Sequence, residues 1–220
     1  DLSTSFIDGA LGTDGNTVYL VVDLFPAGFA LNTSRHRPVA GQNGLDEHGH
    51  LRLRRLQKDT AIIGEPEYGE AAANGSYDYY LRFADHSIYE YSSGARVEGY
   101  TVDAWFNITC PNGKVTNLFF ADSPYQPYPT NYLYLTSSSD GGSSWSAPRL
   151  LNLKKAGEQT LLVGPGNGVY HAANRHMIFT AYEHTSGYER CCLIWMDSAG
   201  VWHRSENATL DTWSSESTAV

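Results

Sequence analysis

Cysteine is scarce in this chain, and so are the other features that define disulfide-rich, metal-binding or membrane proteins. The three cysteines, Cys110, Cys191 and Cys192, are an odd number without CxxC spacing, so we interpret them as buried thiols. No apolar run reaches the roughly 20 residues of a membrane-spanning helix, so no membrane span is expected. His48 and His50 lie in a polar loop without an obvious third ligand, so no metal site is predicted.

Basic residues are also few. The chain has 15 Lys and Arg residues against 24 Asp and Glu residues, which gives a formal net charge of -9 and an isoelectric point near 5.3. Such a surface repels phosphates, so we expect no nucleic-acid partner. The net charge is uninformative about carbohydrates, because an acidic sugar needs only a local cluster of arginines.

Helical periodicity is missing, whereas strand and turn residues are abundant. The chain contains 15 Tyr, 8 Phe and 5 Trp residues, and 21 Gly residues separate short apolar runs. This pattern favours strands joined by tight turns and predicts an all-β fold. The main predicted strands cover residues 17–23, 115–120, 131–137, 160–163, 177–182 and 191–196.

The middle of the chain differs from its two ends. Between residues 50 and 115, strands alternate with turns at Gly75, Gly94 and Gly99, as in a small antiparallel meander. We therefore divide the chain into a segment of a larger fold (1–33), an inserted β-domain (34–114) and a second segment of the larger fold (115–220).

The most specific motif follows the strand predicted at 131–137. Its sequence, Ser-Ser-Asp-Gly-Gly-Ser-Ser-Trp (138–145), matches the Asp-box Ser-x-Asp-x-Gly-x-Thr-Trp with Ser144 in place of Thr. Asp140 is expected to accept hydrogen bonds from turn amides, and Gly142 to supply a permissive backbone angle. Trp145 is expected to pack under the turn. A degenerate copy starts at Asp197, also after a strand, and the spacing of the two copies suits successive blades of a β-propeller.

The chain resembles the bacterial-type exo-sialidases, in the branch with an inserted β-domain that includes intramolecular trans-sialidases. The resemblance covers most of the chain and rests on the order of motifs at 5–8, 21–26, 129–145, 164–168, 179–182 and 215–220. It implies part of a six-bladed β-propeller with an inserted small antiparallel β-domain, a secreted or cell-surface location, sialylated glycans as substrates and no cofactor.

The resemblance also implies a mechanism. Sialidases use a tyrosine nucleophile whose phenol proton passes to a nearby Glu, together with an acid/base Asp and three arginines that hold the substrate carboxylate. Glu216, in Glu-Ser-Thr-Ala-Val (216–220), matches the segment that carries the family's glutamate; an isolated Glu would otherwise be a solvated charge. The tyrosine and two arginines are expected after Val220, and the first arginine and the acid/base Asp before Asp1.

Four further residues are candidates for substrate binding. Tyr182 can reach the glycerol side chain or the aglycon, or can simply pack in the core. Gln159 can contact the glycerol or N-acetyl group, or can be a surface residue. Asp8 is placed where the family has a pocket acid, although a turn role is the alternative, and Asn32 can contact the N-acetyl group.

Two other functions compete with sialic acid release by hydrolysis or intramolecular transfer. One is a non-catalytic Asp-box propeller that binds glycan or protein, because a fold alone does not define chemistry. The other is a glycosidase with two carboxylates. In each case both ends of the chain are typical of mid-domain sequence, so we expect the remainder of the same polypeptide to be its partner and the 220 residues to be inactive alone.

Overall fold

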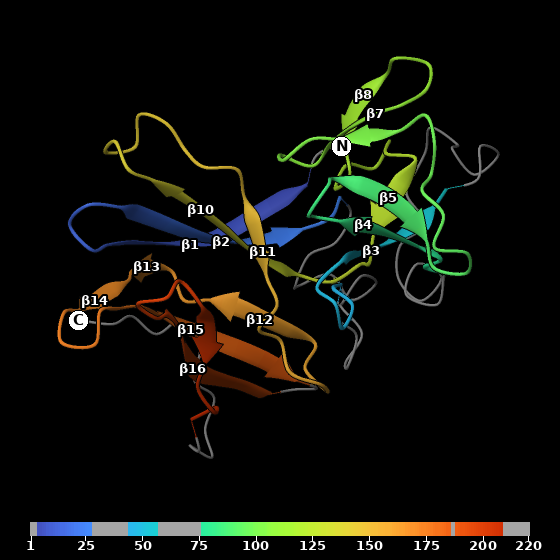
Figure 1. The fold of residues 1–220 in the computed structure, drawn as a ribbon. Helices are drawn as coiled ribbons and strands as arrows, with labels where there is room; N and C mark the ends of the chain where they lie inside the picture. The colour runs from blue at the N-terminus through green and yellow to red at the C-terminus, as the bar shows by residue number, and fades with distance from the viewer. Residues whose placement is uncertain (1–3, 28–43, 57–75, 186–187, 209–220) are drawn as a thin grey trace. The chain divides into compact units, whose positions relative to one another are not determined.

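The computed structural model describes residues 4–27, 44–56, 76–185 and 188–208 (Figure 1). The described residues form strands and turns without a helix, which confirms the all-β prediction. None of them belongs to a helix long and apolar enough to cross a membrane. The strands are β1 (Ser5–Thr13), β2 (Val18–Phe25), β3 (Leu51–Arg55), β4 (Tyr79–Arg82), β5 (Ser87–Glu90), β6 (Thr101–Val102), β7 (Asn107–Thr109), β8 (Val115–Asn117), β9 (Tyr125–Pro127), β10 (Tyr132–Ser138), β11 (Arg149–Leu151), β12 (Thr160–Val163), β13 (Gly166–Asn167), β14 (Val169–His171), β15 (His176–Thr185), β16 (Tyr188–Met196) and β17 (Trp202–Arg204).

The described residues fall into two compact units. The first contains residues 4–5, 25–27 and the described part of 44–130, and the second contains residues 6–24 and the described part of 131–208. In chain order the first unit therefore interrupts the second between β2 and β10.

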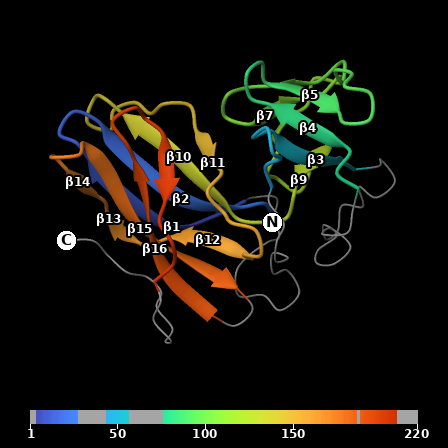
Figure 2. The same ribbon diagram turned by 60° about the horizontal axis from the view of Figure 1, so that its bottom comes forward.

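The second unit contains two five-stranded sheets, each with four successive strands that form a meander and one short added strand (Figure 2). In the first meander the neighbours are β1, β2, β10 and β11, with β2 and β10 antiparallel from Tyr132 opposite Leu24 to Ser138 opposite Val18. In the second meander the neighbours are β12, β15, β16 and β17. The short strand β13 pairs with β1 in parallel, and β14 pairs with β15. Four-stranded sheets in sequence order are the blades of a β-propeller.

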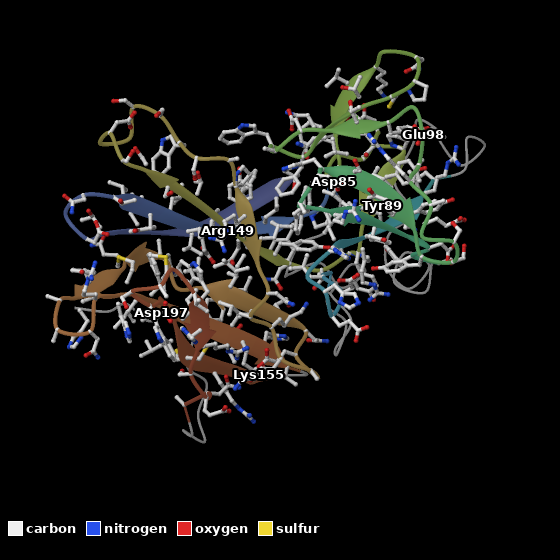
Figure 3. The ribbon with its side chains drawn as sticks, in the orientation of Figure 1. Asp85, Tyr89, Glu98, Arg149, Lys155 and Asp197 are labelled. Atoms are coloured by element: carbon white, nitrogen blue, oxygen red, sulfur yellow. The ribbon has the colours of Figure 1, made fainter. Side chains whose placement is uncertain are left out.

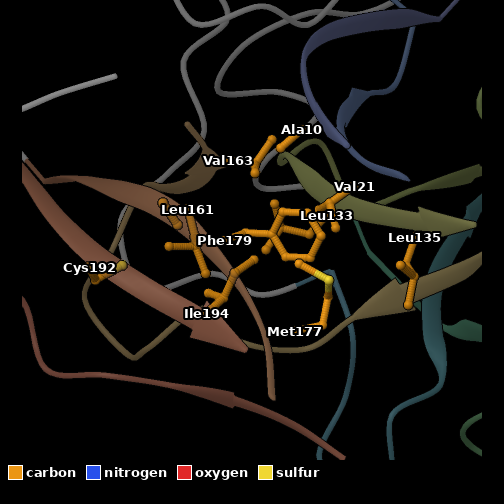
Figure 4. Packing of buried hydrophobic residues seen from close by; sticks show 11 residues of the cluster. Ala10, Val21, Leu133, Leu135, Leu161, Val163, Met177, Phe179, Cys192 and Ile194 are labelled. Carbon is orange, nitrogen blue, oxygen red and sulfur yellow. The ribbon is translucent and has the colours of Figure 1, made fainter. Parts of the chain in front are cut away.

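The core of the second unit lies between these two blades (Figure 4). Alternating apolar residues of β2 and β10 meet those of β12, β15 and β16, because each strand turns every second side chain to one face. Phe179 is fully buried at the centre of this core. The cluster comprises Ala10, Val21, Leu133, Leu135, Leu161, Val163, Met177, Phe179, Ala181, Cys192 and Ile194.

The turn between β10 and β11 makes the hydrogen bonds expected of residues 138–145. Asp140 accepts the Ser144 amide at 2.9 Å and the Ser144 hydroxyl at 2.6 Å, and the Ser138 hydroxyl lies 2.7 Å from the same carboxylate. The bonds from Ser144 are the main reason why the pKa of Asp140 falls to about 2. Gly142 has φ 93°, where a residue without a side chain is favoured.

The turn between β16 and β17 uses Asp197 in the same way (Figure 3). Its carboxylate accepts the amides of Ala199 at 2.9 Å and Val201 at 3.0 Å, and contacts His203 at 2.7 Å. Each blade thus places an aspartate turn between its third and fourth strands. Asp140 and Asp197 therefore occupy equivalent positions in the two described blades.

The first unit contains a four-stranded sheet ordered β5-β4-β3-β9 and a three-stranded sheet ordered β6-β7-β8. The strand predicted at 115–120 to open the second propeller segment is β8, which pairs with β7 in this unit. It ends at Asn117, because the side-chain oxygen of Asn117 accepts the Phe119 amide at 3.1 Å and turns the chain.

Candidate active site

Two of the predicted site residues meet in the second unit. Asp8 lies on β1 and Tyr182 lies on β15, 174 positions later in the chain, and the Tyr182 hydroxyl donates a hydrogen bond to Asp8 Oδ2 at 3.3 Å. Tyr182 is only 3% exposed. This burial favours a role in which Tyr182 orients the Asp8 carboxylate.

The backbone of Asp8 is unusual. Its φ is 42°, close to the left-handed region that side chains other than Asn and Asp rarely adopt. Such a conformation costs free energy and persists where the surrounding structure enforces it, often at functional sites. Asp8 therefore combines a constrained backbone, partial exposure and a bonded carboxylate.

Gln159 immediately precedes β12. Its backbone amide donates to the His184 carbonyl at 2.9 Å, and its side-chain oxygen lies 2.9 Å from His184 Nδ1. Lys154 donates to the Gln159 carbonyl at 3.3 Å, and burial lowers the pKa of Lys154 to about 8. Gln159 and Tyr182 lie close together along the paired strands β12 and β15. Thr160, which follows Gln159, faces His184, and Leu162 faces Tyr182.

A buried ion pair supports the loop before Gln159. Arg204 donates to both carboxylate oxygens of Glu158 at 2.6 and 2.8 Å, and the side chains are 3% and 7% exposed. The Lys155 amide also donates to Glu158 at 2.7 Å, and the side chain of Lys155 lies in the same loop (Figure 3). A bidentate pair out of water fixes this loop against β17.

The sequence analysis did not single out Asp23 as a site residue. Asp23 lies on β2, is fully buried, and accepts the Val163 amide with both oxygens at 3.1 and 3.2 Å. Burial raises the pKa of Asp23 well above its usual value, and the nearby charge of Asp8 raises it further. The sequence feature that could have identified Asp23 is a carboxyl side chain at a position where the alternation of the strand predicts an apolar residue.

Glu216 and Asn32 lie outside the described residues, so their predicted roles stay predictions. Cys110 and Cys191 are partly buried and Cys192 is buried, all as free thiols. In the described ranges no three His, Cys, Asp or Glu side chains are grouped to hold a metal ion.

Comparison with known proteins identifies relatives that are named as sialidases. No family model matches the chain. Sialidase B of Streptococcus pneumoniae serotype 4 is 31% identical over 215 residues, which are 92% of this chain and 30% of that protein. The anhydrosialidase of Macrobdella decora is 28% identical over 184 residues, covering 76% of this chain and 23% of that protein. The chain thus spans less than a third of either curated relative.

Solved structures agree with this fold. The intramolecular trans-sialidase from Ruminococcus gnavus, in complex with oseltamivir carboxylate, matches with a TM-score of 0.71 and 26% identity, over 93% of this chain and 44% of that one. The leech intramolecular trans-sialidase, complexed with 2,7-anhydro-Neu5Ac, matches with a TM-score of 0.73 and 24% identity, over 94% of this chain and 32% of that one.

The two consecutive blades and the inserted strands define the class: the chain is part of a six-bladed β-propeller with an inserted antiparallel β-unit. The relatives then define the family. The chain belongs to the bacterial-type sialidases.

Proposed function

We propose that the protein is a glycosidase that releases terminal sialic acid from glycoconjugates. The observation that carries this proposal is the 31% identity to Sialidase B over 92% of the chain. Sialylated glycans are the proposed substrates, and the rest of the propeller, in the same polypeptide, completes the site. Because such glycans decorate cell surfaces and secreted proteins, we further propose a secreted or cell-surface location.

The proposed mechanism assigns Glu216 as the partner of a tyrosine nucleophile. A neutral phenol avoids repulsion from the substrate carboxylate, and a glutamate that accepts its proton makes it nucleophilic. Glu216 is proposed on the Glu-Ser-Thr-Ala-Val segment alone.

The remaining candidates are proposed to bind the sugar. Asp8 accepts a hydrogen bond from a sugar hydroxyl, since its carboxylate is partly exposed and is oriented by Tyr182. Gln159 and Asn32 contact the glycerol and N-acetyl groups. The covalent intermediate is resolved either by water or by a hydroxyl of the sialic acid itself, and the relatives include proteins named sialidase, anhydrosialidase and intramolecular trans-sialidase.

The test is release of sialic acid from an α2,3-sialylated substrate by the full-length protein, with mass spectrometry of the product. Glu216→Gln is expected to lower kcat by roughly 10²–10⁴-fold, the usual contribution of a general base. Free sialic acid would identify hydrolysis, and an anhydro-sugar would identify intramolecular transfer.

Glu206→Gln is the matched control, because Glu206 is 93% exposed and pairs only at the surface with Lys155 at 2.8 Å. It is expected to keep wild-type kcat. If the wild type releases no sialic acid from any linkage, the proposal fails and a non-catalytic propeller that binds glycan or protein takes its place.

A further inference from the structure

A carboxyl stands in a row of the core where the strand pattern calls for an apolar side chain. On β2, Tyr19 and Val21 face the core between the two blades, and Asp23 is the next residue on that face. Asp23 is 0% exposed. A buried carboxyl costs free energy unless it is bonded, so its presence at a core position calls for a specific role.

The carboxyl of Asp23 bonds the backbone of the first strand of the other blade. One edge of β12 pairs with β15, and along the opposite edge the Val163 amide donates to Asp23 at 3.1 Å. Asn131 bonds the same edge of β12, because its side chain accepts the Leu161 amide at 3.2 Å and donates to the Leu161 carbonyl. Two buried side chains of the first blade therefore bond backbone groups of β12 that none of the described strands pairs.

This attachment lies next to the pair formed by Asp8 and Tyr182. Val163 follows Leu162, the residue directly opposite Tyr182 on β15, and Tyr182 donates to Asp8 at 3.3 Å. The charge of Asp8 also acts on Asp23 directly. Asp23 is thus connected to Asp8 both electrostatically and through β12.

We propose that Asp23 is a positioning residue of the candidate active site: its buried carboxyl holds β12 against the first blade and thereby keeps Tyr182 bonded to Asp8. This inference rests on the proposed function, which makes Asp8 a ligand of the sugar.

Protonation of Asp23 controls the charge beneath the site. The charged group that acts on Asp23 is Asp8 of β1. The other titratable side chains on the neighbouring strands are Tyr182 of β15 and Tyr132 and Tyr134 of β10. The four residues of β12 carry no titratable side chain. Below its raised pKa Asp23 is neutral, and above it a second negative charge forms beside Asp8. A second charge disfavours an anionic sugar, so KM of the wild type rises as the pH increases through that pKa.

Three variants of the full-length protein separate positioning from general stability. Asp23→Leu removes the acceptor of the Val163 amide and is expected to raise KM about tenfold with kcat changed by less than about twofold, as for lost binding. Asp23→Asn keeps a hydrogen-bond acceptor but cannot become charged. The KM of this variant is therefore expected not to rise with pH as the KM of the wild type does. Asn131→Leu removes the other bond to β12 without changing a charge, and is expected to keep the pH profile of the wild type.

A readout without substrate tests the same proposal. Because the pKa of Asp23 is raised on folding, the folded state holds the proton longer, so its contribution to stability is complete below about pH 3.9 and is lost as the pH rises through the folded pKa. The melting temperature of Asp23→Asn relative to wild type is therefore expected to increase from pH 4 upward, and hydrogen exchange of the Val163 amide is expected to accelerate in Asp23→Leu.

Each outcome decides between the two proposals. Identical KM and pH profiles for wild type and Asp23→Leu would overturn the positioning role while leaving sialic acid release intact. An inactive wild type would end the proposed function. In that case hydrogen exchange at Val163 tests the structural part of the inference alone: a faster rate in Asp23→Leu would support the attachment of β12 by Asp23, and an unchanged rate would overturn it.

Discussion

Buried charge is the most informative feature at the scale of single residues. Glu158 and Arg204 are almost completely excluded from water and form two bonds with each other, while the buried carboxyl of Asp23 accepts the Val163 amide. The ion pair keeps both of its groups charged, whereas burial raises the pKa of Asp23. The ion pair lies next to Gln159 along the chain, and Asp23 lies beside Asp8, so both support predicted sugar contacts.

Breaking the buried ion pair on one side is predicted to be costly. Arg204→Met leaves the Glu158 carboxylate buried without its partner, which typically costs about 3–5 kcal/mol. The double variant Glu158→Leu with Arg204→Met is expected to recover most of that loss, because it removes both charges of the pair and leaves neither without its partner. Thermal unfolding of the four proteins in a double-mutant cycle measures this coupling. Equal destabilisation by the single and double variants would contradict it.

At the scale of elements, turn chemistry and close packing define the blades. Asp140 and Asp197 each organise the turn between the third and fourth strands of a blade. Glycine serves packing as well as turns: an added Cβ at Gly168 would lie 2.5 Å from the Phe179 ring. Gly168 follows β13, so its missing side chain lets this segment approach β15.

Gly168→Ala is accordingly predicted to destabilise the fold by about 1–3 kcal/mol, the usual cost of overpacking a core. Gly9→Ala is the matched control, because its Cβ would meet Leu20 and Val22 at an ordinary 3.9 Å. Chemical denaturation of both variants gives the comparison. Equal stability of the two would show that Phe179 moves aside without cost.

At the scale of the whole molecule, the described part of the second unit leaves apolar surface on its first strand. Phe6 is 52% exposed, Ile7 36% and Leu11 47%, all on β1. Exposed apolar residues on a strand favour association with other chains. The matched segment is less than a third of either curated relative, so we propose that further strands of a longer polypeptide cover this surface.

The 220 residues expressed alone are therefore predicted to aggregate and to release no sialic acid, whereas the full-length protein is predicted to be soluble. Size-exclusion chromatography with an activity assay on each fraction tests this. Replacing Phe6 and Leu11 by Ser is expected to reduce the aggregation. Val201→Ser, at an equally exposed position in a turn, is the control and is expected to change little. A soluble, active 220-residue monomer would be the contrary result.

The sequence alone was sufficient for the features that depend on neighbouring residues. A short apolar run between turn residues predicted β12 at its observed bounds, and Asp140 with Gly142 predicted the bonds of their turn, because both signals depend only on neighbouring residues. Local patterns were less reliable where a side chain ended a strand, as Asn117 does after β8. The motifs also identified the family that the comparisons show.

Only the tertiary structure decided which of these residues meet. Asp8 and Tyr182 are separated by 174 positions and Asp23 and Val163 by 140, and no periodicity within one strand encodes such contacts. Whether Asp23 is a neutral acid or a charge depends on its burial between two blades, since the same carboxyl in water would keep its usual pKa. The local chemistry of this chain follows from its sequence, and the candidate site follows from long-range packing that brings three strands together.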